Sequence, residues 1–233
     1  MKTFKNFNIH YRENTTDDKV IIEVLKTNVY EKKKINFTIN ENENWLDLGG
    51  NIGTFSLLCL SKKANVITYE PEPDNFELLT KNVETNFPTN TNYKLIKAGV
   101  GITTDEIPLY ICKGDYNKYR HTIYKKRGRE SITIKIQSIL DVLREHKVDC
   151  IKMDIEGAEI DILELLKPED YRNANIQKLV FEYSFDFDKS IPRFLKIVDT
   201  LKEYFRVVEF SKFKEGETVY NYFPCMKMVY CMI

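Results

Sequence analysis

Beyond about residue 44 the chain alternates short apolar runs with segments of helical period, and this alternation constrains the fold more than any other feature. The run of residues 65–70, for example, is followed by a helical pattern over 73–86 and a further apolar run at 93–98. Strands joined by helices of this length form a mainly parallel sheet that is covered on both faces. The sequence therefore predicts a doubly wound α/β fold.

The other strands and helices are predicted from the same periodicity of apolar residues. The predicted strands are 45–48, 65–70, 93–98, 107–112, 132–136, 150–154, 178–182, 206–210 and 226–232. One helix is predicted to begin near Phe55, and four others are predicted over about 73–86, 138–146, 158–166 and 191–204. Residues 100–136 differ from the rest of this region, because the short predicted strands 107–112 and 132–136 flank a polar, aromatic and basic loop.

Residues 1–40 differ from the rest because apolar and polar side chains alternate with the period of a strand. The runs Val20–Leu25 and Ile35–Ile39 carry this alternation most clearly. We therefore predict an N-terminal β-hairpin extension over residues 1–40, packed on a main domain over 41–233. No Pro/Gly/Ser linker divides the chain.

Charge and cysteine content limit the possible partners and compartment. Thirty-five basic side chains balance 35 acidic ones, so nucleic acid is not an expected partner, and the cluster Lys125–Arg129 is interpreted as a solvated loop. The five cysteines are scattered without a Cys-x-x-Cys pair, which favours free thiols in a reducing compartment. No apolar run approaches the length of about 18 residues that a membrane span needs. We expect a cytoplasmic protein without membrane association.

The first strand-to-helix turn, Asp47–Gly53, is where a doubly wound sheet binds its ligand. Glycines allow a sharp turn, and the following helix points free N–H groups toward the ligand. A dinucleotide fingerprint needs glycine at its first, third and sixth positions, but here the third and sixth are Asn51 and Thr54. The methyltransferase pattern, an acidic residue followed by glycines at alternating positions, is met with one substitution by Asp47, Gly49, Asn51 and Gly53.

Glu70 supports the interpretation that this turn binds a cofactor that contains a nucleoside. It follows Gly49 by 21 residues and ends the second predicted strand. A carboxylate at this place accepts hydrogen bonds from both hydroxyls of a ribose. A tight turn beside an ordinary surface glutamate is the alternative, and the order and spacing of the two features make it the weaker one.

With these motifs in view, the sequence resembles the FkbM family of S-adenosylmethionine-dependent methyltransferases. The resemblance rests on three blocks in the expected order: WLDLGGNIGTFS (45–56), YEPEPDNFELLTKN (69–82) and IKMDIEGAEIDIL (151–163). It implies a class I methyltransferase fold with a seven-stranded, Rossmann-like sheet. It also implies O-methylation of sugars or other small hydroxylated molecules.

Carried over residue by residue, the resemblance also assigns the cofactor contacts. It places Asp47, Gly49, Asn51 and Gly53 at the methionyl part of S-adenosylmethionine. Glu70 would hold the ribose, and Gly99, with Ala98, would border the adenine. Gly50 stands where the family has alanine, which is a small change.

Three carboxylates are candidates for the catalytic work. Asp154, Glu156 and Glu182 are predicted at the carboxyl ends of neighbouring strands, so they meet at one rim of the sheet. They suit a general base, or a magnesium or calcium site in which Asp154 and Glu182 are ligands. Alternatively, Glu156 and Glu159 cap the following helix; this structural role is preferred for Glu159 and the functional one for Asp154 and Glu156.

His121 is a further candidate base because it lies in the polar insertion that would overhang the acceptor. An exposed loop histidine without a role is an equally good interpretation. The same insertion carries Tyr116, Tyr119 and Tyr124, whose rings suit stacking on a sugar.

The predicted function is methyl transfer from S-adenosylmethionine to a hydroxyl of a small or glycan acceptor, with Mg²⁺ as an optional further cofactor. Two alternatives remain open at this stage: an RNA ribose O-methyltransferase, and a catalytically silent cofactor-binding module. A nicotinamide-dependent oxidoreductase ranks last because two of its three glycines are missing.

Overall fold

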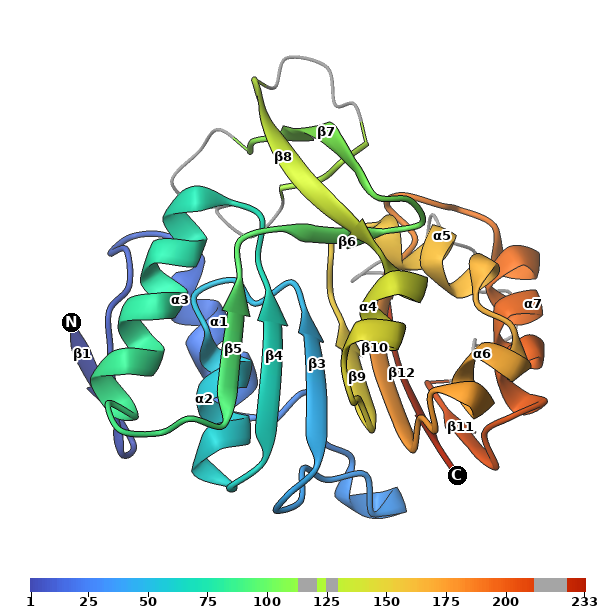
Figure 1. Cartoon of the computed structure of the whole chain (residues 1–233), viewed down its shortest axis with the longest axis horizontal. Helices are drawn as coiled ribbons and strands as arrows, with labels where there is room; N and C mark the ends of the chain where they lie inside the picture. Colours follow the sequence, from blue (N-terminus) through green and yellow to red (C-terminus); the bar gives the residue numbers. More distant parts are fainter. Residues whose placement is uncertain (113–120, 125–129, 212–225) are drawn as a thin grey trace.

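The computed structural model describes residues 1–112, 121–124, 130–211 and 226–233. At its centre lies a seven-stranded sheet with the order β11-β12-β10-β9-β3-β4-β5 (Figure 1). The strands are β3 (Asn44–Leu48), β4 (Asn65–Tyr69), β5 (Tyr93–Ile96), β9 (Cys150–Met153), β10 (Lys178–Ser184), β11 (Val207–Glu209) and β12 (Met226–Met232). All neighbours are parallel except β12, which is antiparallel to both β10 and β11. The predicted doubly wound, mainly parallel sheet is confirmed.

Helices cover both faces of this sheet (Figure 1). They are α2 (Thr54–Ser61), α3 (Pro73–Asn86), α4 (Ile139–Glu145), α5 (Ala158–Leu165), α6 (Pro168–Asn173) and α7 (Ile191–Lys202). Of these, α6 was not predicted. Successive strand residues point to opposite faces, so Trp45 packs with α2 and α3, whereas Leu46 packs with α4 to α7.

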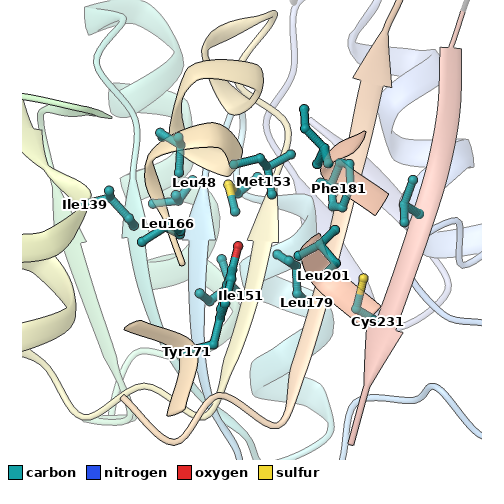
Figure 2. Close-up of a cluster of buried hydrophobic side chains, with 14 of the residues drawn as sticks. Leu48, Ile139, Ile151, Met153, Leu166, Tyr171, Leu179, Phe181, Leu201 and Cys231 are labelled. Carbon is teal, nitrogen blue, oxygen red and sulfur yellow. The ribbon is translucent and has the colours of Figure 1, made fainter. Parts of the chain in front are cut away.

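The larger of the two cores lies between the sheet and α4 to α7. Figure 2 shows side chains of β3, β9 and β10, including Leu48, Ile151 and Phe181, packed against Ile139 of α4 and Leu201 of α7. These side chains are almost completely buried. Because each central strand is buried on both faces, its sequence is nearly continuously apolar, which is why these strands were predicted correctly.

The N-terminal extension contains the expected hairpin, but at a different place. Strands β1 (Lys2–Phe4) and β2 (Phe7–Ile9) form it. The run predicted as its clearest strand is helical instead, in α1 (Asp17–Ile21) and the π-helix η1 (Ile22–Lys26). Its buried residues Ile21, Val24 and Leu25 are spaced by three and four, which is the period of a helix face.

The prediction of a strand over Ile35–Ile39 is also wrong. A 3-10 helix, η2 (Lys33–Ile35), occupies its start, and only an isolated bridge joins Lys32 to Phe37. The extension packs on the same face as α2 and α3, where Ile21 and Phe37 share a core with Trp45 and Phe55. The division of the chain at residue 40 stays a prediction.

A second sheet of three strands lies across the carboxyl ends of the main sheet (Figure 1). It consists of β6 (Gly99–Gly101), β7 (Asp105–Tyr110) and β8 (Ser131–Ser138), in the order β6-β8-β7. Two of its strands were predicted, and β6 was not. Leu109, Ile134 and Ile136 form a small apolar cluster on it.

Four cysteines within the described residues, Cys59, Cys112, Cys150 and Cys231, are free and buried. Cys225 lies outside the described residues. Across the described ranges, no helix has both the length and the apolar character of a membrane span.

Candidate active site

A cavity of about 310 Å³ opens at the carboxyl ends of the parallel strands, beneath the three-stranded sheet. This volume lies at the lower end of the range of small-molecule sites. All but two of the predicted site residues line it, namely Gly49, Asn51, Glu70, Gly99, His121, Asp154, Glu156 and Glu182. Asp47 and Gly53 do not line it. The fold therefore brings together residues that are far apart in the sequence.

The glycine turn packs directly against the turn that follows β9. Gly49 has a φ of +84°, and a Cβ atom there would lie 1.9 Å from the carbonyl oxygen of Asp154. The backbone N–H groups of Gly49 and Gly50 both donate to the carbonyl of Tyr69, at 3.0 Å. Only glycine fits at position 49, because the left-handed conformation and the close backbone contact both exclude a side chain.

Glu70 forms part of the cavity wall directly after β4. Its carboxylate accepts hydrogen bonds from the backbone N–H groups of Asn51, at 2.7 Å, and Glu72, at 2.9 Å. Burial raises the pKa of Glu70 to about 7. The side chain is thus held in place by the glycine turn itself, and its charge changes close to neutral pH.

Asp47 lies behind the glycine turn rather than in the cavity. Its carboxylate is completely buried and forms an ion pair with the Lys152 ammonium at 3.0 Å. Lys152 also donates to the carbonyls of Leu48, at 3.2 Å, and Gly49, at 2.7 Å. Burial by itself lowers the pKa of Lys152, but the nearby carboxylates of Asp47 and Asp154 outweigh it and raise the pKa. Direct contact of Asp47 or Gly53 with a cofactor stays a prediction.

The three candidate catalytic carboxylates line the same cavity. Asp154 follows β9, is half-buried, and accepts a 2.5 Å hydrogen bond from the hydroxyl of Tyr30. Glu156 has a φ of +56°, and its carbonyl accepts a 2.8 Å hydrogen bond from the hydroxyl of Thr122. Glu182 is not the end of its strand as predicted, because β10 continues to Ser184.

The magnesium hypothesis finds no support in this geometry. In the described part of the chain, no three His, Cys, Asp or Glu side chains form a group that could hold a metal ion. Asp154 and Glu182 therefore do not form a cation site with a third such ligand among these residues.

Glu159 has the structural role preferred for it. Both of its carboxylate oxygens accept a hydrogen bond from the N–H of Gly157, at 3.0 and 3.1 Å, at the start of α5. Burial raises the pKa of Glu159 to about 8. The side chain satisfies a free N–H group at the helix N-terminus.

His121 is buried at the cavity wall, and its Nδ1 accepts a 3.1 Å hydrogen bond from the N–H of Cys112. A ring nitrogen that accepts an N–H carries no proton, so the proton of neutral His121 lies on Nε2. The Nδ1 lone pair is thus engaged by the N–H of Cys112, and the predicted role as base stays a prediction. The hydroxyl of Tyr124 donates a 2.7 Å hydrogen bond to the carboxylate of Asp161 on α5. Tyr116, Tyr119 and the basic cluster lie outside the described residues.

The sequence analysis missed one wall of the cavity. Residues Lys19, Val20, Glu23, Val24, Val29 and Tyr30 of the N-terminal extension line it. Most of them belong to α1 and the π-helix η1, and π-helical turns are frequent at functional sites. The helical spacing of Ile21, Val24 and Leu25 was the signal for this segment, but nothing in the local pattern showed where it would pack.

Comparison with known proteins agrees with the geometry. The model of the methyltransferase FkbM domain matches residues 47–208, which include the glycine turn, Glu70 and all three candidate carboxylates. The chain belongs to this family. Two curated relatives are Methyltransferase sdnD from Sordaria araneosa, at 26% identity, and Hexuronic acid methyltransferase AglP from Haloferax volcanii, at 31%.

The matched regions are partial. The alignment covers 51% of this chain and 58% of sdnD, and 53% of this chain and 49% of AglP. The chain thus spans about half the length of the curated relatives that it matches.

Solved structures support the fold alone. A methyltransferase FkbM from Methylobacillus flagellatus matches 91% of this chain and 52% of its own, with a TM-score of 0.56 and 17% identity. The METTL16 methyltransferase domain covers 91% of this chain and 68% of its own, with a TM-score of 0.51 and 13% identity.

Proposed function

We propose that this protein is an S-adenosylmethionine-dependent O-methyltransferase that acts on a hydroxyl of a small acceptor. Membership of the FkbM family supports the reaction type. The single observation that carries the proposal is the arrangement of the cavity, where Glu70 and Asp154 directly follow β4 and β9, the two strands that flank β3 and its glycine turn.

The residues present fit this cofactor. Gly49 leaves the turn without a side chain, and Glu70 is a carboxylate fixed by two backbone N–H groups at the place where a ribose needs an acceptor. Gly99 lines the same cavity beyond Glu70, where the adenine is expected. Bound there, S-adenosylmethionine would supply a methyl group already activated by its sulfonium.

The chain's own residues would then activate the acceptor. A hydroxyl is a weak nucleophile, and it needs a base to take its proton as its oxygen bonds to the methyl carbon and the carbon–sulfur bond breaks. Asp154 is placed for this step because it is half-buried and lines the cavity. The proton would pass to the Asp154 carboxylate, leaving a neutral thioether.

For the acceptor we propose a sugar of a glycan or glycoconjugate. The name of the relative AglP, Hexuronic acid methyltransferase, supports this class. We also propose a cytoplasmic location, which the four free cysteines among the described residues support.

Calorimetric titration with S-adenosylmethionine, S-adenosylhomocysteine and, as control, NAD tests the cofactor. We expect the first two to bind and NAD not to bind. If a folded sample binds neither sulfur nucleoside, the proposal fails and the protein is a scaffold without this cofactor.

Transfer of labelled methyl groups to a panel of monosaccharide glycosides, including uronic acids, tests the acceptor. We expect Asp154→Ala and Glu156→Ala each to abolish transfer while S-adenosylmethionine still binds. Normal turnover in both variants would remove the assigned catalytic role of these carboxylates.

A further inference from the structure

Tyr30 makes the one hydrogen bond that the described residues offer to the carboxylate of Asp154. Its hydroxyl donates to Oδ2 at 2.5 Å, across 124 residues of sequence. Tyr30 is buried, with 6% of its surface exposed, and it lines the cavity. It lies outside residues 47–208, the part of the chain that matches the family, so the family pattern does not include it.

The residues on both sides of Tyr30 are anchored by hydrogen bonds and an ion pair. The carbonyl of Val29 accepts a 2.6 Å hydrogen bond from the hydroxyl of Tyr230 on β12. The carboxylate of Glu31 forms a 2.5 Å ion pair with Lys62 and accepts a 2.8 Å hydrogen bond from the N–H of Ile39. Several separate contacts thus anchor the loop that carries Tyr30, so the place of its ring does not depend on any one of them.

The ring itself is also held from two sides. It packs edge-to-face on Phe55 with centroids 5.2 Å apart, and the Lys152 ammonium lies 5.2 Å from its centroid. Lys152 is the cation that pairs with Asp47 behind the glycine turn. One phenol therefore contacts both the base candidate and the buried ion pair that supports the turn.

The hydroxyl is a permanent donor in these surroundings. Burial raises the pKa of Tyr30 well above its usual value, and the neighbouring charge of Asp154 raises it further. Tyr30 thus keeps its proton at neutral pH and offers it to Oδ2. A carboxylate bonded through one oxygen has a restricted rotation, which leaves Oδ1 for another partner.

We propose that Tyr30 is a positioning residue that holds the Asp154 carboxylate in the cavity with Oδ1 directed at the acceptor. This inference rests on the proposed function for its consequence in turnover. The N-terminal extension then contributes a functional residue, Tyr30, to the site. A misplaced reacting group costs about a hundredfold in rate for a shift of about 1 Å, so the effect should be measurable.

The test compares Tyr30→Phe with Tyr230→Phe. The first removes the hydroxyl that contacts Asp154 and keeps the ring; the matched control removes a buried hydroxyl that anchors the same loop and does not contact Asp154. With a sugar acceptor found in the panel, we expect Tyr30→Phe to lower kcat by about tenfold to a hundredfold with KM for the acceptor within about twofold. Tyr230→Phe should change both by less than about twofold. An equal loss of kcat in both variants would show loop anchoring alone and overturn the proposal.

Carbon NMR of protein labelled at the aspartate Cγ provides a readout that needs no acceptor. The Asp154 signal is identified by its absence in Asp154→Asn. We expect this signal to shift or broaden in Tyr30→Phe and to stay unchanged in Tyr230→Phe. An unchanged signal in Tyr30→Phe overturns the positioning role, whereas failure of the wild-type protein to bind S-adenosylmethionine overturns the proposed function.

Discussion

At the scale of single residues, the Asp47–Lys152 ion pair supports the geometry of the site. Both side chains are buried: 3% of Lys152 and none of Asp47 is exposed. The Lys152 ammonium joins the acidic residue at the end of β3 to the carbonyls of the glycine turn. The pair thus holds β3, β9 and the turn in one arrangement.

Lys152→Met should destabilise the protein strongly. The substitution leaves the Asp47 carboxylate buried without its cation, and breaking a buried pair in this way costs about 3–5 kcal/mol. Urea unfolding followed by circular dichroism measures the loss. Lys2→Ala, which removes the exposed pair between Lys2 and Asp18, is the control and should cost less than about 1 kcal/mol. Equal effects of the two substitutions would contradict the structural role of Lys152.

Glu70 leads to a prediction about pH. Its pKa of about 7 in the free protein should fall when ribose hydroxyls donate to the carboxylate, because hydrogen bonds to the charged form favour it. Binding below pH 7 then requires release of a proton, so affinity weakens as pH falls, by at most about tenfold per pH unit. Above pH 7 the carboxylate is already ionised and affinity is constant.

Calorimetry with S-adenosylhomocysteine at pH 6, 7 and 8 measures this dependence. Glu70→Gln should bind more weakly and with no change between pH 6 and 8, since an amide does not titrate. A wild-type affinity that does not vary over this range would show that Glu70 does not bind the ribose.

At the scale of elements, helix starts illustrate which local signals stabilise the fold. The side chain of Ser190 caps α7 by accepting a 3.1 Å hydrogen bond from the N–H of Arg193, and proline occupies the first turn. Ser138 precedes α4 without such a hydrogen bond. The two serines stand at equivalent positions and differ in that contact.

Ser190→Ala should therefore lower the free energy of unfolding by about 1 kcal/mol, the usual value of an N-cap hydrogen bond. Ser138→Ala should cause a smaller loss. Thermal or urea unfolding of the two variants checks the difference, and a larger loss at Ser138 would contradict the assignment of the caps.

The elements also show where local patterns succeed and fail. Helix α3 was predicted over the residues that it occupies, because Pro73 and the apolar spacing define it locally. Residues 20–25 were assigned to a strand because the run was interpreted as an alternation of apolar and polar side chains with the period of a strand. Tertiary packing favoured the helical period over the strand period, because it buries Ile21, Val24 and Leu25 on one helix face.

At the scale of the whole molecule, the N-terminal extension and the main sheet share one apolar core. Side chains of the extension that are buried in it include Phe7, Ile9, Ile21, Val24, Leu25, Tyr30, Phe37 and Ile39. Each contributes about 1.5–3 kcal/mol when fully buried. Together they contribute more than the net stability of most domains, which is about 5–15 kcal/mol.

Deletion of residues 1–40 should consequently abolish cooperative unfolding of the remaining chain. Urea titration followed by near-UV circular dichroism measures it. Deletion of residues 1–5 is the control, because β1 contributes mostly exposed side chains, and it should retain a cooperative transition. A cooperative transition in the longer deletion would show that residues 41–233 fold independently.

The sequence by itself determined the succession of strands and helices in the main domain apart from β6 and α6, the glycine turn, and the candidates Glu70 and Asp154. These features are local, since periodicity and turn chemistry depend on residues within a few positions of one another. The tertiary structure alone decided that Asp47 pairs with Lys152 and that Tyr30 meets Asp154. Partners separated by 105 or 124 positions come together only when the sheet is assembled, and no local pattern encodes that contact.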